Sequence, residues 1–182
     1  MAEAFSSDVQ RTTTWSIFLS VLMIIAGILA IASPLWAGVA VTALVGWLLL
    51  FSAVLHLVYA FQGGKPSAVL WEVLLAVVYG VIGFYILRNP SIGLASLTFA
   101  IAFFLFVEAF LEFALSYQLR GESGTGWFLF DGIVTLILAI LIWASWPSSS
   151  QWAIGTLIGV SMLFSGIARV MLTSTVRRMI SA

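Results

Sequence analysis

Long apolar runs separated by short polar breaks organise this chain. Six runs stand out, at residues 15–32, 39–60, 69–88, 93–117, 127–145 and 151–172. Helices fit these runs, because each is too long and too uniformly apolar for the short alternating strands of a membrane barrel. About 20 apolar residues suffice to cross the hydrocarbon core once. The pattern therefore predicts an all-α, polytopic membrane protein, with six transmembrane helices in a single transmembrane domain over residues 1–182.

The breaks between the runs are of two alternating kinds. "SPLW", "RNPSIG" and "SWPSSS" are short and contain proline, whereas "FQGGKPSA" and "LRGESGTG" are longer, glycine-rich and charged. Proline and glycine clusters of these kinds mark turns. The alternation predicts helical hairpins, each closed by a proline turn and joined to the next by a longer loop.

The hairpins recur with a period of about 56 residues, and such self-similarity at a fixed period indicates an internal repeat. Trp15, Trp71 and Trp127 are equally spaced, and Pro34 and Pro90 have the same spacing. Small residues follow the period too: Gly27, Gly83 and Ala139 align in the first helix of each hairpin, and Gly46, Ala102 and Gly159 in the second. We therefore predict three hairpin repeats, at about 15–60, 71–117 and 127–172, which are parallel because each contains an even number of spans.

Composition supports the membrane assignment. The chain is 63% hydrophobic and 8% charged, against roughly 45–50% and about 25% in soluble domains. The first run is also longer than the apolar part of a signal peptide and follows a mixed polar segment, so we interpret it as a retained span.

Other features of the composition exclude several function classes. The chain has no cysteine, so disulfides and thiolate metal ligands are excluded. Net charge is zero and no basic stripe occurs, which argues against nucleic-acid binding. The sequence also lacks the recognisable catalytic and phosphate-binding motifs. We expect no enzyme activity, no catalytic residue, no cofactor and no metal, and a lipid bilayer as the main partner.

The distribution of lysine and arginine predicts the orientation. Cytoplasmic loops of membrane proteins carry an excess of these residues. Arg88 is the one such residue at the proline-turn side, whereas the other side holds both termini and five of them: Arg11, Lys65, Arg120, Arg177 and Arg178. We expect both termini to face the cytoplasm, in a bacterial inner (plasma) membrane.

Polar residues inside the spans also align under the repeat. The second, fourth and sixth helices each carry a polar pair four residues apart, a spacing that places both members on one helix face. These pairs are Ser52/His56, Glu108/Glu112 and Ser165/Arg169. If the three faces converge on a pseudo-threefold axis, Glu108, Glu112, Arg169 and His56 form a layer that takes up or releases protons, since charges inside a bilayer must be paired, protonated or hydrated.

A structural role for these residues is the alternative. Arg169 is close enough to its helix end for its side chain to extend to the headgroups, and a Glu112–Arg169 pair would simply fix two helices together. His56 would then be an interfacial hydrogen-bonding residue. Asp131 is a secondary candidate because it lies deeper than Glu72, for which the positive end of the helix is a sufficient explanation.

Small residues at a spacing of four mark close helix contacts. Gly155 and Gly159 form a GxxxG motif, and Gly46 belongs to a similar stripe with Gly38 and Thr42. Such faces let helix backbones approach closely. We expect packing within one chain, with a homo-oligomer interface as the alternative use.

These motifs resemble the HdeD family of bacterial membrane proteins, which is built from the short repeat DUF308. The resemblance rests on "AGILAIASP", "IGFYILRNP" and the hairpin rhythm, and extends from about Trp15 to Leu172. It implies an inner-membrane protein of acid resistance and envelope stress defence. It implies no catalytic residues.

Three hypotheses for the function follow. The first is an HdeD-like stress protein whose Glu108/Glu112/Arg169/His56 layer responds to protons. The second is a small proton- or ion-coupled transporter or channel that uses this layer as its path. The third is a scaffold that transports nothing and binds a protein partner in the membrane.

Overall fold

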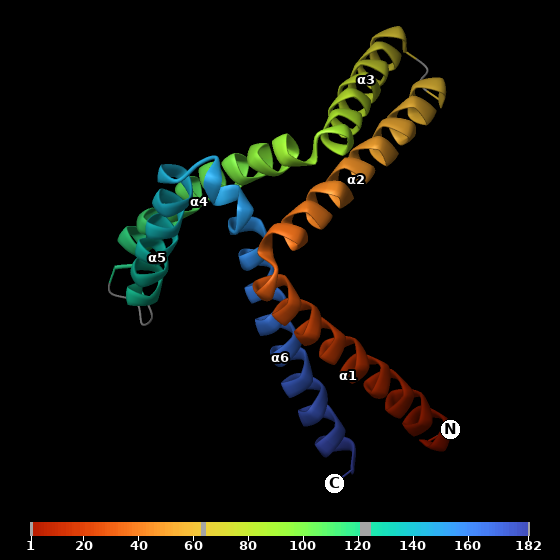
Figure 1. Cartoon of the computed structure of the whole chain (residues 1–182). Coiled ribbons are helices and arrows are strands. Elements are labelled where there is room, and N and C mark those ends of the chain that lie inside the picture. The colour runs from red at the N-terminus through yellow and green to blue at the C-terminus, as the bar shows by residue number, and fades with distance from the viewer. Residues whose placement is uncertain (1, 63–64, 121–124, 182) are drawn as a thin grey trace. The chain divides into compact units, whose positions relative to one another are not determined.

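Helices make up the described chain almost completely. A computed structural model describes the backbone of residues 2–62, 65–120 and 125–181, and the side chains of residues 15–62, 65–120 and 125–174. In this part of the chain the elements are helical throughout (Figure 1). They are α1 (Ala2–Ala32), α2 (Pro34–Gln62), α3 (Pro66–Arg88), α4 (Pro90–Gln118), α5 (Thr125–Ala144), the short 3-10 helix η1 (Ser148–Gln151) and α6 (Ala153–Ser181).

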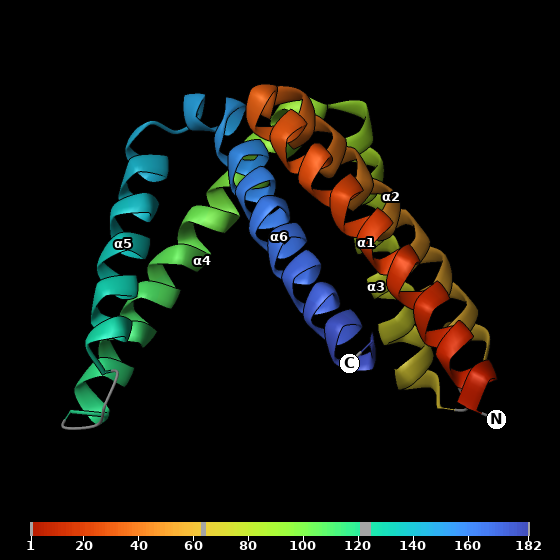
Figure 2. The same cartoon turned by 90° about the horizontal axis from the view of Figure 1, so that it is seen from below.

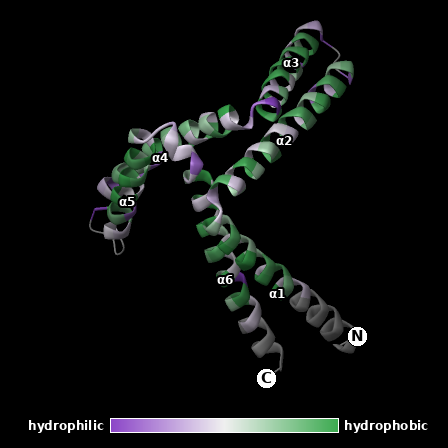
Figure 3. Cartoon of the chain, in the orientation of Figure 1, coloured by the Kyte–Doolittle hydropathy of each residue, from purple (hydrophilic) through white to green (hydrophobic). Residues whose placement is uncertain are grey.

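Six of these helices are long and apolar enough to cross a membrane. The qualifying segments are Trp15–Ala32, Pro34–Gln62, Pro66–Arg88, Pro90–Gln118, Thr125–Ala144 and Ala153–Ser174. Hydrophobic residues cover the helices along most of their length (Figure 3). The predicted all-α, polytopic membrane fold is thus confirmed.

The helices begin closer to the proline turns than the sequence predicts. α2 starts at Pro34 and α4 at Pro90, a few residues before the expected starts at 39 and 93. Proline is tolerated in the first helical turn because its missing N–H has no intrahelical partner there. As a result a single residue, Ser33 or Asn89, separates the helices on either side. Glycines 63 and 64 and residues 121–124 of the longer loops lie outside the described residues.

The chain divides into two compact units. The first contains Met1–Ala37 and Ile154–Ala182, and the second contains Gly38–Ala153. In the first unit α1 packs against α6. In the second, α2 lies beside α3 and α4 beside α5, as both views show (Figure 1, Figure 2).

Small residues form the contacts in each helix pair. A Cβ atom added to Gly83 of α3 would lie 2.9 Å from the carbonyl oxygen of Gly46 of α2. One added to Gly27 of α1 would lie 2.8 Å from the carbonyl oxygen of Gly159 of α6. The aligned Ala102 and Ala139 are almost completely buried in the second unit. The small residues that recur once in each repeat therefore lie where the helix backbones approach closely.

A second set of small residues lies between these contacts and the loop-side ends of the helices. Gly166 of α6 faces the carbonyl oxygen of Ser20 in α1, and Gly80 of α3 faces Ala53 of α2 at ordinary contact distance. The buried hydroxyls of Thr42 and Thr98 donate to the carbonyl oxygens four residues earlier, at 2.8 Å. Large side chains such as Trp47 and Phe104 are more than 60% exposed. This distribution suits helices surrounded by lipid, where apolar side chains face outwards and small ones pack.

Candidate functional site: polar pairs between helices

His56 of α2 faces Glu72 of α3. Its Nδ1 atom lies 2.6 Å from Oε2 of Glu72, and the two side chains are 27% and 30% exposed. The imidazole ring also lies against the ring of Tyr79, with the centroids 5.2 Å apart and a tilt of 31°. Since Nδ1 faces a carboxylate, it carries the proton and donates.

Glu112 of α4 faces Asp131 of α5. Asp131 and Thr135 lie beside the Glu112 carboxyl group, and Glu108 lies one helical turn away on the same helix. The Cβ of Glu112 would be 3.2 Å from a Cβ at Gly132, so the absence of a side chain there brings the two helices together. The Oε2 atom of Glu112 is buried and has no hydrogen-bond partner among the described residues. This contact joins two acids, unlike the acid–base contact between α2 and α3.

Both contacts occupy one depth on the even-numbered helices. His56 is six residues from the end of α2 at Gln62, and Glu112 is six residues from the end of α4 at Gln118. At a rise of 1.5 Å per residue, this depth is about 9 Å from the helix end. The odd-numbered helices differ, since Glu72 directly follows Trp71 whereas Asp131 lies four residues after Trp127.

The third helix pair, α1 with α6, carries hydroxyl groups at this end. The Oγ of Ser16 lies 3.2 Å from Oγ1 of Thr173. Arg169, which aligns with His56 and Glu112, is exposed on α6, and Ser165 is half-buried one turn before it. Arg169 belongs to the first unit and Glu112 to the second. The pairing of Glu112 with Arg169, and the convergence of the three polar faces, therefore stay predictions.

The structure brings together some of the predicted residues and adds one. Glu112 and Asp131 meet, with Glu108 close by. Ser52 lies half-buried one turn before His56. Glu72 is the residue that sequence analysis missed as a site residue, because its place near a helix start explained it sufficiently. One signal in the sequence could have identified it. Glu72 lies near the start of the helix that follows the helix of His56, and only a short loop separates the two helices.

The glycines chosen for packing lie at close helix contacts. A Cβ on Gly155 would overlap the carbonyl group of Pro34, one on Gly159 would approach Ile31 and Gly27, and one on Gly46 would approach Leu87. Each of these contacts is within one unit of the chain.

The described residues include no group of three or more His, Cys, Asp or Glu side chains arranged to hold a metal ion.

Comparisons with known proteins agree with the repeat. The model of the family described as "Short repeat of unknown function (DUF308)" matches residues 18–88, 74–144 and 141–181. The second match begins and ends one full repeat after the first, at the period given by the tryptophans.

Curated relatives point in the same direction. The chain is 29% identical over 150 residues to protein HdeD of Escherichia coli strain K12. This alignment covers 81% of this chain and 79% of that protein. HdeD of Escherichia coli O157:H7 and of Shigella flexneri match to the same extent. No solved structure matches the chain. The family matches cover most of the residues from α1 to α6, and the chain is a multi-pass membrane protein that belongs to the DUF308 family, with HdeD proteins among its relatives.

Proposed function

We propose that this protein acts in acid and envelope stress resistance at the bacterial inner membrane, and that its polar helix pairs respond to protons. The observation that carries the proposal is the pair of contacts at one depth, His56 with Glu72 and Glu112 with Asp131. The resemblance to the HdeD family supplies the physiological setting. The excess of lysine and arginine at the loop side supports cytoplasmic termini, which would place both contacts in the cytoplasmic half of the membrane.

The two contacts respond to acid in different ways. Two carboxylates that face each other repel when both are ionised, and they share a hydrogen bond once one has gained a proton. Acid therefore draws α4 and α5 together near Glu112 and Asp131. Acid affects the contact between His56 and Glu72 in two opposite ways, since a proton on the imidazole makes it an ion pair and a proton on Glu72 breaks that pair. The proposed proton response therefore differs between the two helix pairs, and it requires no enzyme activity or cofactor.

Survival of an acid challenge tests this role. A strain that lacks its own copy of the gene would carry the wild-type protein, an empty vector or the double variant Glu112→Gln/Asp131→Asn, at matched membrane levels. We expect rescue by the wild type and survival at the empty-vector level for the double variant. A Glu3→Gln variant, altered in the polar segment ahead of the first span, is the matched control and should rescue.

Two outcomes would contradict the proposal. Rescue by the double variant would make the acidic pair structural. Failure of the wild type to rescue would remove the acid-resistance role altogether.

A proton- or ion-coupled transporter is the second candidate function. Glu108 lies one turn deeper than Glu112 and continues the line of acids toward the bilayer centre. Purified protein in liposomes should then acidify the lumen in response to a pH gradient, and Glu108→Gln should abolish the flux. Liposomes that stay as tight as protein-free ones would exclude this function and leave the proton-responsive role intact.

A further inference from the structure

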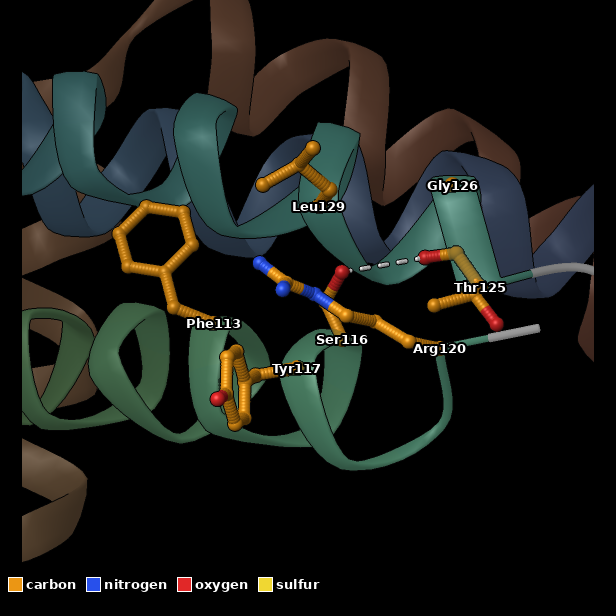
Figure 4. A pocket seen from close by; sticks show the side chains of 7 residues that line it. All are labelled: Phe113, Ser116, Tyr117, Arg120, Thr125, Gly126 and Leu129. Carbon is orange, nitrogen blue, oxygen red and sulfur yellow. Dashed lines mark hydrogen bonds between the residues drawn. The ribbon is translucent and has the colours of Figure 1, made fainter. Parts of the chain in front are cut away.

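A cavity opens between the end of α4 and the beginning of α5. Its volume is about 440 Å³, and its walls come from Phe113, Ser116, Tyr117, Arg120 and Leu129, with the first two residues of α5 (Figure 4). The hydroxyl of Ser116 donates to the carbonyl oxygen of Thr125 at 3.4 Å, which joins the two helices beside the cavity. The proton-responsive contacts are separate from it, because neither Glu112 nor Asp131 lines it.

Arg120 supplies the charge of the cavity. Its guanidinium carbon lies 4.2 Å from the centroid of the Tyr117 ring. In Figure 4 the side chain of Arg120 extends along the cavity and ends between Leu129 and Tyr117. Stacking on an aromatic face restricts the guanidinium group but leaves its N–H edges available, and these edges match the oxygens of a phosphate group.

The cavity combines a cation with apolar walls. Arg120 contributes the available donors, and Leu129 and Phe113 contribute apolar surface on the side where its guanidinium group ends (Figure 4). None of the described residues that line the cavity is an aspartate or glutamate. A cation among apolar side chains at a membrane interface is stabilised by an anion.

From these observations we infer that the cavity binds the phosphate headgroup of an anionic phospholipid at Arg120, with the start of an acyl chain against Phe113 and Leu129. Basic pockets between transmembrane helices are suited to such headgroups. The ligand chemistry is a phosphate group attached to an apolar chain, and free phosphate has only the first of these two parts. The site is independent of the proposed acid response, since it uses none of the same side chains.

Native mass spectrometry of the full chain in detergent tests the inference. Equal amounts of phosphatidylglycerol and phosphatidylcholine would be added, and retained lipid counted. We expect the wild type to retain one phosphatidylglycerol in preference to phosphatidylcholine. Arg120→Gln should weaken phosphatidylglycerol binding about fivefold or more, the effect of one basic residue next to an anionic lipid.

Two further variants control for charge and for folding. Arg88→Gln removes the same charge from an arginine that lies 5.9 Å from the Phe84 ring, away from the cavity, and should leave phosphatidylglycerol retention unchanged. Leu129→Trp keeps Arg120 but fills the cavity, and should also weaken retention. It tests the site even where Arg120→Gln does not fold.

Three results would overturn the inference. The first is equal retention of the two lipids by the wild type. The second is unchanged retention by Arg120→Gln or by Leu129→Trp. The third is full competition of phosphatidylglycerol by inorganic phosphate, which would assign the site to the free anion. A failed acid challenge would not contradict this lipid site, because the two experiments test different residues.

Discussion

The α2–α3 pair and the α4–α5 pair are built on the same repeat, but their polar contacts have opposite character. Both pairs bring helices together through small residues, Gly46 with Gly83 in the first and the buried Ala102 and Ala139 at the aligned positions of the second. In the first pair an imidazole faces a carboxylate, and in the second two carboxyl groups face each other. The difference shows that side-chain size fixes the helix contact, whereas the charge at the contact can change independently.

The positions that flank the contacts follow the same period. Tyr79 lies against His56, and Thr135, at the equivalent position of the next repeat, lies beside Glu112. The acidic partners do not follow it, because Glu72 aligns with Phe128 and Asp131 aligns with Leu75. Tyr79 and Thr135 therefore keep the aligned position beside the contact, while the acid moves by about one turn on the odd-numbered helix.

Breaking the shared packing should have the largest effect. A Cβ on Gly83 would lie 2.9 Å from the Gly46 carbonyl oxygen and 3.0 Å from the Leu50 amide nitrogen, both of them backbone atoms. Gly83→Ala should destabilise the protein by about 1–3 kcal/mol, because the helices must separate. Thermal unfolding in detergent measures this loss.

Gly80→Ala is the matched control on the same helix. Its added Cβ would meet only the Ala53 Cβ at 3.6 Å, an ordinary contact. This variant should unfold at the wild-type temperature or above it, since alanine favours a helix over glycine. Equal destabilisation by the two variants would mean that the close contact at Gly83 does not determine stability.

Converting one contact into the other should have the next largest effect. His56→Glu places two carboxylates together between α2 and α3, as between α4 and α5. At neutral pH we expect a loss on the order of 2 kcal/mol, since the half-buried site lies between the exposed and the buried limits for ion pairs. Unfolding curves from neutral to acid pH measure the effect, which should shrink in acid as one carboxylate gains a proton.

His56→Gln separates charge from hydrogen bonding at this position. It keeps a donor for Glu72 and adds no negative charge, so it should lack the recovery in acid. A His56→Glu variant whose stability deficit stays constant as the pH falls would show that the two carboxylates do not interact.

The fold could be predicted from the sequence because its signals are local and repeated. A lipid environment requires long apolar helices, which are visible as apolar runs in the sequence. The regular spacing of the tryptophans and prolines gives the length of the repeat. α2 and α4 begin a few residues before the starts that the apolar pattern predicts, because Pro34 and Pro90 belong to the first helical turn and not to the turn between helices.

The polar contacts were predictable only in part. Alignment of the repeats identifies His56 and Glu112 because these residues occupy equivalent positions. It cannot identify Glu72 as the partner of His56, or assign Asp131 to Glu112, because the partners lie out of register on the odd-numbered helices. Which side chains meet depends on the rotation of each helix about its axis, which a periodic sequence does not specify.

The same chemical change should have opposite signs in the two pairs. Asp131→Asn removes one of two like charges and offers an amide donor to Glu112, so it should stabilise the protein at neutral pH by about 1 kcal/mol, the net value of a hydrogen bond. Glu72→Gln removes the carboxylate that His56 binds and should destabilise it by a similar amount. Chemical unfolding at neutral pH compares the two, and changes of the same sign would refute the contrast between the pairs.

The smallest effect is expected at the aromatic contact of His56. Tyr79→Thr places in α3 the residue that α5 carries at the aligned position, Thr135, and removes the ring whose centroid lies 5.2 Å from that of the imidazole. Aromatic pairs contribute about 0.5–1.5 kcal/mol beyond their buried area, and half-exposed ones belong at the low end of this range. Tyr79→Phe keeps the ring and should unfold like the wild type. Because the ring also restricts the imidazole that faces Glu72, the loss caused by Tyr79→Thr should be smaller in a His56→Gln background. Unfolding of Tyr79→Thr in both backgrounds checks this, and an equal loss in the two would mean that the ring does not act through the histidine.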